Sequence, residues 1–337
     1  MGRRWGTWRD GLERAADVAL EWSWRARSRA RDGLEQALGE APGRVPGVVV
    51  YWPRHYDWEL TPKWVDGLKA GLARQAKLVE AHLPQPFERI VLFELSIGGQ
   101  RVPVALDYAD LPEVNATCAR QVRHYFKMQY RREGYALSNV VPGGFVPGNP
   151  RLESYLPHVR ALRDAGRFRH DVLGRFSLAF ASETRQRALR MLAGQERFDF
   201  TGGTKLMRYS RYLREIATAR VCVDLPGNGP FCFRLVDCLA VGACVVAVRH
   251  KTTMPRELVD GEHLAYVRED LSDLVETCAR YVEDDLARER LARNARAFFD
   301  GILQVDALAR CYLHACLAGL PWAGREYPTG GAVFALP

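Results

Sequence analysis

Residues 224–248 read DLPGNGPFCFRLVDCLAVGACVVAV, and this stretch decides the fold class. It begins at the end of one apolar run, passes through a glycine-rich loop and finishes in a second apolar, β-branched run. Between the two, FRLVDCLAV has apolar residues at helical spacing and is followed by Gly242, a helix stop signal. The order strand, loop, helix, strand is typical of a parallel sheet with helices on both faces.

The same alternation continues on both sides of this stretch. Strand-like runs occur at HDVLGRF, RFDF, VCVDL, ACVVAV and HLAYV. Helical patterns separate them at ETRQRALRMLAG, at LMRYSRYLREIATA and over 271–303, and a short helix is expected near Pro255. This half of the chain is therefore predicted to be a doubly wound α/β domain.

The first half of the chain predicts a second α/β unit. VVVYWP at 48–53 suits a buried strand, and TPKWVDGLKAGLARQAK predicts a helix with Thr61 as N-cap and Pro62 at the first helical position. RIVLFELSIGGQRVPVALD predicts two strands joined by a hairpin turn at Gly98 and Gly99. The fold class expected for the whole chain is α/β with two Rossmann-like domains.

Length and composition set the domain organisation and the class of protein. The 337 residues suffice for two ordinary domains, and 47% hydrophobic with 26% charged residues is typical of a soluble globular protein. We expect an N-terminal helical arm over 1–45, a first domain over 46–168, a second over 169–305, and a C-terminal helix and tail over 306–337.

Cellular location follows from three negative signals. No window has 18 consecutive apolar residues, the N-terminus has no continuous apolar signal sequence, and no two of the eight cysteines form a C-x-x-C pair. These features predict a cytoplasmic protein with reduced cysteines and no metal site. The arm over 1–45 combines tryptophan with arginine, so it either packs on the body of the protein, which we favour, or lies on a membrane surface.

Positive charge gathers in one segment. The chain carries a formal charge of +8, and 151–220 alone holds 15 Lys and Arg against 7 Asp and Glu. A phosphorylated small molecule, a nucleic acid and a solvated basic face are all compatible with this excess.

The loop and helix of 224–248 are suited to binding a nucleotide diphosphate. Gly227, Asn228 and Gly229 form a loop that allows close backbone approach, and Pro230 suits the first position of a helix whose N-terminus attracts phosphate. Arg234 is placed to contact a diphosphate oxygen, and Asp237 lies one turn further on the same face, placed to accept from a ribose diol. The alternative is a surface ion pair between these two side chains, with glycines that only make a turn.

A family resemblance extends this interpretation. YSRYLREIATARVCVDLPGNGPFCFRLVDCLAVGACVVAV, followed by MPRELVDGEHLAYVREDLSDL, resembles the C-terminal half of exostosin-like glycosyltransferases and, more distantly, CAP10-like O-glucosyltransferases. The resemblance implies the GT-B fold, with two domains facing a cleft and a nucleotide-sugar donor, UDP-sugar favoured, held by the second domain. Arg175, Lys205 and Arg234 would then lie near the diphosphate, and Asp237 at the ribose.

Glycosyl transfer also needs a base that accepts the proton of the acceptor hydroxyl. The candidates end predicted strands of the first domain: Asp107 and Asp110 in VALDYADLP, then His55 and Asp57 in WPRHYDWEL. Aspartates at such positions commonly cap turns, which is the structural alternative. GT-B enzymes generally work without a metal, and we expect no metal or other cofactor here.

Further expectations concern the acceptor side and the competing classes of protein. His124 and Lys127 in HYFKMQY suit an exposed strand face, with a place on the acceptor side as the alternative. The acceptor itself stays open among glycan, lipid, protein and small molecule. Two other classes of protein compete with a glycosyltransferase: another nucleotide-dependent enzyme and a non-catalytic polyanion-binding protein. The sequence has neither G-x-G-x-x-G nor G-x-x-x-x-G-K-[ST], and this absence counts against the first of them. We expect no nucleic-acid partner.

Overall fold

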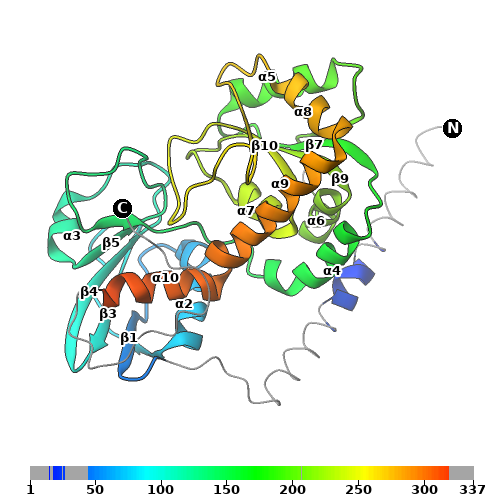
Figure 1. Cartoon of the computed structure of the whole chain (residues 1–337). Coiled ribbons are helices and arrows are strands. Elements are labelled where there is room, and N and C mark those ends of the chain that lie inside the picture. Colours follow the sequence, from blue (N-terminus) through cyan, green and yellow to red (C-terminus); the bar gives the residue numbers. More distant parts are fainter. Residues whose placement is uncertain (1–14, 16–17, 25, 27–44, 206, 319–337) are drawn as a thin grey trace.

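A computed structural model describes residues 15, 18–24, 26, 45–205 and 207–318. It contains two β-sheets, one from each half of the chain, with helices around them (Figure 1). The predicted α/β class with two Rossmann-like domains is confirmed, with one departure in the first sheet.

The first sheet has six strands in the order β2-β1-β3-β4-β5-β6. All are parallel except β3, which runs antiparallel to both of its neighbours. The hairpin prediction is confirmed, because Ile97 pairs with Gln100 across Gly98 and Gly99, both at positive φ as such a turn requires. The strands are β1 (Val48–Pro53), β2 (Lys77–Ala81), β3 (Ile90–Ile97), β4 (Gln100–Asp107), β5 (His124–Lys127) and β6 (Val140–Pro142).

Two helices belong to this sheet, α2 (Thr61–Gln75) and α3 (Ala116–Gln121). The Thr61 N-cap prediction is wrong by one residue, because the helix begins at Thr61 and its hydroxyl instead hydrogen-bonds Tyr108 at 2.8 Å. Asn115 caps α3 through its side chain. The loop after β4 is therefore attached to the start of α2 as well as leading into α3.

The second sheet has five strands, all parallel, in the order β11-β10-β9-β7-β8. The chain leaves β7 for the edge strand β8 and then returns to the other side of β7 to form β9, so the direction of winding reverses between β7 and β9. The strands are β7 (His170–Arg175), β8 (Phe200–Gly203), β9 (Ala219–Asp224), β10 (Cys244–Val248) and β11 (Ala265–Val267).

Helices cover both faces of this sheet, as a doubly wound fold requires. One face is covered by α5 (Ser182–Ala193) and α8 (Leu274–Glu283). The other is covered by α6 (Tyr209–Ala217), α7 (Phe233–Val241) and α9 (Asp285–Phe298), with α4 (Leu152–Asp164) packed on α6 and α7. Helix α7 ends as predicted at Gly242, which has φ of 82°. The helix expected near Pro255 does not form.

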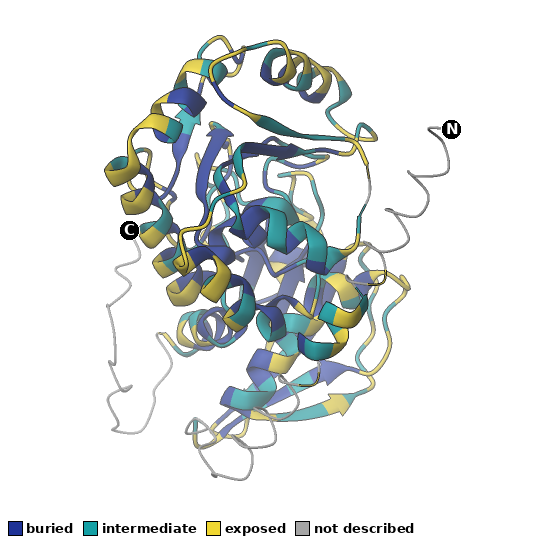
Figure 2. Cartoon of the chain, turned by 90° about the vertical axis from the view of Figure 1, so that its right-hand side faces the viewer, coloured by how far each residue is buried: buried dark blue, intermediate teal, exposed yellow. Residues whose placement is uncertain are grey.

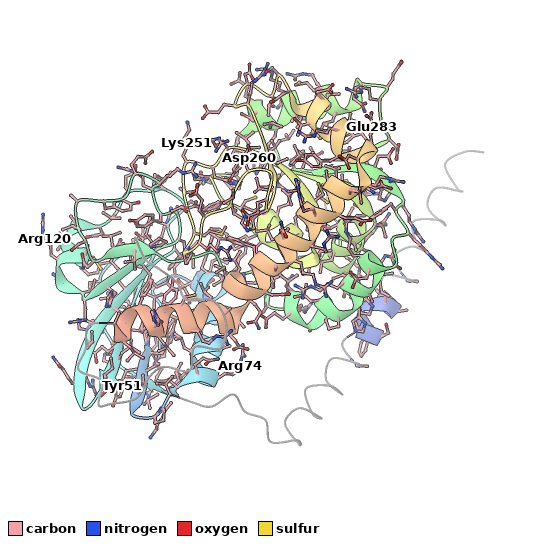
Figure 3. All side chains as sticks on the ribbon, in the orientation of Figure 1. Tyr51, Arg74, Arg120, Lys251, Asp260 and Glu283 are labelled. Carbon is pink, nitrogen blue, oxygen red and sulfur yellow. The ribbon has the colours of Figure 1, made fainter. Side chains whose placement is uncertain are left out.

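The chain then returns to the first domain. A π-helical turn, η1 (Phe299–Leu303), leads from α9 into α10 (Val305–Leu317), which packs along α2 (Figure 1). Arg74 of α2, labelled in Figure 3, pairs with Asp306 of α10 at 2.6 Å. This helix therefore belongs with the first sheet. The domain boundaries proposed from the sequence stay predictions, although the packing of α4 places it with the second sheet.

The apolar core runs without a break from one domain to the other. One cluster joins the first sheet and α2 to α7, α9 and α10, and a second fills the space between the second sheet and the helices α5 and α8. Buried strands lie at the centre of Figure 2, and the exposed residues lie on the outer faces of the helices. The two sheets therefore meet through packed side chains.

Most of the predicted N-terminal arm lies outside the described residues. In its described part, the Trp24 ring is buried, stacks on His158 and meets Tyr155 edge-on, both on α4. Glu21 accepts a hydrogen bond from Ser210 of α6. This part of the arm packs on the second domain. Within the described part of the chain, no helix is long and apolar enough to cross a membrane.

Candidate functional site

The carboxyl ends of β7 and β9 form the point where the winding of the second sheet reverses. In open α/β sheets ligands bind outside the carboxyl ends of the strands at such a point. Arg175 ends β7 and is followed by Phe176, and Asp224 ends β9 and is followed by the loop 225–232. The glycine-rich loop of the sequence therefore lies where the topology predicts a ligand site.

Arg234, in the first turn of α7, bridges these two strand ends. Its Nη1 donates to Asp224 Oδ1 at 3.1 Å and to the Leu225 carbonyl at 3.2 Å. The guanidinium carbon also lies over the Phe176 ring, 4.7 Å from the centroid. Among the described residues only Nη1 of this side chain makes hydrogen bonds, and 14% of the side chain is exposed. The other nitrogens of the fork are therefore available to an anion.

Sequence reasoning missed a second guanidinium beside the loop. Arg185 of α5 donates to the Pro226 carbonyl at 3.0 Å and to the Ser177 carbonyl at 2.5 Å, and only 3% of it is exposed. Burial, with Arg234 nearby as a lesser cause, lowers the pKa of Arg185. Nothing in the local pattern around Arg185 marks it, since it lies 41 residues before the loop it holds.

Charge at this point is incompletely balanced. Asp224 is fully buried, and its Oδ1 also accepts a contact from the Cys232 thiol at 3.1 Å. Its Oδ2 is buried without a hydrogen-bond partner among the described residues. The guanidiniums of Arg234 and Arg185 both lie near this carboxylate, although only Arg234 contacts it, so the site carries an excess of positive charge that favours an anionic ligand.

The glycine loop lies against the first domain. A Cβ on Gly229 would overlap the Asp110 carbonyl and lie 2.5 Å from Gln129 Nε2, so only glycine fits there. The Gln129 amide forms two hydrogen bonds with the backbone of Phe231, at 3.0 and 3.1 Å. Asn228 is exposed and donates to Asp110 Oδ2 at 3.1 Å. Gly227 is less crowded, with Arg185 Nη2 at 3.4 Å from an added Cβ.

Helix α7 begins later than the sequence suggested. Its first residue is Phe233 and its N-cap is Cys232, so Pro230 is not the first helical position and instead lies in the loop. The first amides of the helix are therefore those of Phe233 and Arg234, whereas the Leu235 amide already donates to the Cys232 carbonyl at 3.1 Å. The helix dipole and the guanidinium favour negative charge at the same place.

Asp237 is more buried than a surface ion pair requires. Only 5% of it is exposed, and its Oδ1 accepts a hydrogen bond from the Tyr209 hydroxyl at 2.6 Å. It forms no ion pair with Arg234, whose partner is Asp224. Burial raises the pKa of Asp237 to about 7, because the charged carboxylate is poorly solvated there.

The two remaining predicted donor-binding residues are placed differently. Arg175 is held by Glu215 of α6 in a two-point ion pair, one contact of which measures 3.0 Å, so its charge is already balanced. Lys205 follows β8 and is exposed. Of the predicted cations, Arg234 is therefore the one that joins the strand ends.

Asp107 lies in a buried cluster at the end of β4. Its Oδ1 accepts from Lys127 Nζ at 2.8 Å, and its Oδ2 accepts from the Tyr125 hydroxyl at 2.5 Å. Lys127 is completely buried, so the exposed strand face expected for it is wrong; His124 is half-buried. Burial raises the pKa of Asp107 and lowers that of Lys127, and their mutual contact opposes both shifts. Both oxygens of Asp107 are thus occupied by neighbours.

The other predicted bases lie at the surface of the first domain. Asp110 is half-buried where that domain meets the glycine loop, and it contacts Asn228. His55 and Asp57 are both exposed beyond the end of β1. Asp110 is therefore the candidate that the structure brings next to the loop. The described residues contain no group of three or more His, Cys, Asp or Glu side chains that could hold a metal ion.

Comparisons with known proteins concern mainly the second half of the chain. The family model described as Glycosyl transferase-like matches residues 160–302, which span α4 to η1 and include the whole second sheet. No curated protein sequence matches the chain.

Several solved structures are similar to parts of the chain. The C-terminal domain of the glycosyl transferase group 1 family protein LpcC from Francisella tularensis is 11% identical, covering 42% of this chain and 90% of that one with a TM-score of 0.31. HepE from Anabaena, solved with UDP and glucose, is 16% identical over 64% of this chain and 71% of that one, with a TM-score of 0.38. A variant of TarM from S. aureus, solved in a complex that includes UDP, is 8% identical over 58% and 44%, with a TM-score of 0.38.

These structural scores are too low to carry an argument, so the assignment depends on the family match and on the fold itself. The matched family is glycosyl transferase-like, and the narrower exostosin-like and CAP10-like relationships are not supported by it. Residues 160–302, which hold the whole second sheet, are glycosyl transferase-like, and this match supports a glycosyltransferase enzyme.

Proposed function

We propose that this enzyme transfers a sugar from a nucleotide diphosphate sugar, with a UDP-sugar favoured, to an acceptor hydroxyl without using a metal ion. The observation that carries the proposal is Arg234, which joins the ends of β7 and β9 while leaving part of its guanidinium unpaired. An excess of positive charge at the switch point of a doubly wound sheet supports a phosphate-bearing ligand.

The donor diphosphate would lie at the start of α7. Arg234 would donate to its oxygens, together with the amides of the first helical turn and the loop 227–229. Arg185 would fix the loop from behind, because it already holds the Pro226 carbonyl. When the bond between the sugar and the diphosphate breaks, the leaving oxygen keeps the electron pair, and these donors stabilise its charge.

The nucleoside would be oriented by Asp237. Its Oδ1 is engaged by Tyr209, and its Oδ2 makes no hydrogen bond to a described residue. A ribose diol that donates to Oδ2 favours the charged carboxylate, so nucleotide binding would lower the pKa of Asp237 from about 7. Lys205 at the end of β8 supplies a further cation on the donor side, whereas Arg175 would act through Glu215.

Asp110 is the base that we propose for the acceptor hydroxyl. It belongs to the first domain and is only half-buried, and its Oδ2 accepts a hydrogen bond from Asn228 of the glycine loop. Asp107 would position the loop that carries it, since Asp107 accepts from the Ala109 amide at 2.9 Å. His55 lies on the loop after β1 and remains a weaker candidate.

Ion pairing of the basic segment disfavours the alternative of a polyanion-binding protein. Arg160 pairs with Asp300, Arg197 with Glu276 and Glu283, and Arg220 with Asp171 and Asp285. Part of the charge excess of 151–220 is therefore balanced by acidic residues outside the segment, namely Glu276, Glu283, Asp285 and Asp300. We keep a cytoplasmic location as a prediction, and likewise the absence of a nucleic-acid partner.

A thermal-shift panel of nucleotide diphosphates and nucleotide sugars tests the proposal. A ligand at 100 times its dissociation constant should stabilise the fold by about 2.7 kcal/mol. UDP and UDP-sugars should raise the melting temperature in the presence of a chelator, and the Asp110→Asn variant should keep this shift while losing transfer activity. The proposal fails if no nucleotide or nucleotide sugar shifts the melting temperature, with or without divalent cations.

A further inference from the structure

A cavity of about 540 Å³ opens in the first domain, apart from the glycine loop. Its wall is made by the loop after β1, the start of α2, the segment before β3 and the residue that follows β4. The volume falls within the roughly 300–1,000 Å³ that small-molecule sites occupy. Its lining includes Asp57, Trp58, Gln85, Glu88, Arg89 and Tyr108.

Aromatic rings form one side of this cavity. Trp58 is 41% exposed, and its ring lies within 5° of parallel to that of Tyr108, with centroids 6.3 Å apart. The Trp64 ring also stacks on Tyr108, with centroids 6.0 Å apart. An exposed large indole held parallel to a second ring offers a flat, electron-rich face, which suits the C–H face of a sugar ring.

The lining of the cavity includes two carboxylates, those of Asp57 and Glu88. Among the described residues no hydrogen bond or ion pair engages the carboxylate of Asp57. Glu88 is 86% exposed and pairs with Arg89 at 3.3 Å. Two carboxylates against one guanidinium leave an excess of negative charge, which favours ligands rich in hydroxyl donors over phosphates.

The backbone of the wall is held in an unusual conformation. Arg89 has φ of 57°, in the left-handed region that a non-glycine residue rarely adopts. Its carbonyl accepts the Tyr108 amide at 3.1 Å, and the Gln85 side chain forms two hydrogen bonds with the backbone of Leu92. These contacts fix the wall before any ligand arrives, which lowers the ordering cost of binding.

The aromatic wall connects the cavity to the donor side. Trp64, beside Tyr108, also lies 4.7 Å from Phe233, the first residue of α7. Tyr108 is two residues before Asp110, the proposed base. A molecule bound in the cavity would therefore contact the loop that also carries Asp110, the group proposed to accept its proton.

We infer that this cavity binds a saccharide, and that the acceptor of the enzyme is therefore a glycan. The identification of this saccharide as the acceptor rests on the proposed function. Saccharide binding by the cavity is independent of that function. Trp58 would stack on a sugar ring, and Asp57 would accept from its hydroxyls.

Saturation-transfer NMR on the full chain tests this inference with maltose, cellobiose and N,N′-diacetylchitobiose as probes. At least one should receive saturation from the parent protein. Trp58→Ala should weaken that binding by on the order of ten-fold or more, and Asp57→Asn should weaken it less. Trp22→Ala is the matched control, because Trp22 is 67% exposed and does not line the cavity.

The outcomes separate the cavity from the donor site. No binding of any probe, or binding that survives both Trp58→Ala and Asp57→Asn, would overturn the inference. Competition by uridine that depends on Trp58 would also overturn it, since the cavity would then be a nucleobase site. UDP is titrated in parallel, because saccharide binding without UDP binding would refute the donor proposal and leave the saccharide site standing.

Discussion

The ends of β4 and β9 each carry a buried aspartate paired with a cation, and the two pairs differ in how completely they are closed. At β4, both oxygens of Asp107 are occupied, and Lys127 is completely buried. At β9, Asp224 Oδ2 has no partner among the described residues, and Arg234 is partly exposed. A closed pair stabilises a loop, whereas an open one with excess charge is available to a ligand.

Removing the cation of the closed pair should have the largest effect on stability. Lys127→Met leaves Asp107 buried without its cation, which costs about 3–5 kcal/mol of the free energy of unfolding. Urea denaturation measures this loss. The double variant Lys127→Met/Asp107→Asn should recover much of it, and failure to recover would show that the two side chains do not act as a pair.

Removing the cation of the open pair should affect stability less and binding more. Arg234→Ala should cost about 1.5–3 kcal/mol of stability, because Cys232 still contacts Asp224 and solvent reaches the vacated place. Calorimetric titration should find no UDP binding. Arg249→Ala is the control, since Arg249 is exposed, pairs with Asp260 and lies over the Tyr266 ring. Equal UDP affinity in Arg234→Ala and the parent would show that the Asp224–Arg234 pair does not bind the nucleotide, and would contradict the contrast with the Asp107–Lys127 pair.

The glycine loop offers a matched test of how the two regions meet. Gly229→Ala places a Cβ into the Asp110 carbonyl, which should cost about 1–3 kcal/mol of stability. Gly227→Ala should cost less, because the nearest atom to the added Cβ is 3.4 Å away and belongs to the Arg185 side chain. The two melting temperatures provide the measurement. Equal losses would indicate that the loop does not pack on the first domain in this way.

The pH dependence of stability contributed by Asp237 is gradual, because it is spread over several pH units. The unfolded chain releases this proton near pH 4, whereas the folded chain holds it to about pH 7. Raising the pH between these values therefore lowers the stability of the parent relative to Asp237→Asn, by up to about 1.4 kcal/mol per pH unit.

Ionisation of Asp237 should have the opposite effect on nucleotide binding, so that UDP affinity rises as the pH rises. UDP that donates through its ribose binds the charged carboxylate, so affinity should fall by up to about ten-fold per pH unit as the pH drops below about 7. Titrations at several pH values measure this. A UDP affinity with the same pH profile in Asp237→Asn would remove Asp237 from the nucleotide site.

Local patterns predicted the elements whose cause is local. The hairpin at Gly98 and Gly99 follows from two adjacent residues that tolerate positive φ, and the end of α7 follows from its apolar spacing and Gly242. The start of α7 was harder, because Pro230 satisfies the rule for a first helical position while the loop continues to Cys232. The antiparallel β3 was implied by the hairpin but not by the Rossmann-like expectation.

Contacts between distant residues explain what the sequence did not predict. Lys127 meets Asp107 because β4 and β5 pair in parallel, and Arg185 meets the glycine loop across 41 residues. Neither partner carries a local signal. The candidate base illustrates the same point, since Asp107 and Asp110 are equivalent in sequence and only the fold buries one and leaves the other at the domain junction.

Hydrogen–deuterium exchange with and without UDP tests the central claim most directly, because it locates the ligand on the chain. The account predicts slower exchange over 226–234 and around Tyr209 in the presence of UDP, and no such change in the Asp224→Asn/Arg234→Gln variant. Protection confined to other segments, with 226–234 exchanging as it does without ligand, would contradict a donor site at the junction of β7 and β9.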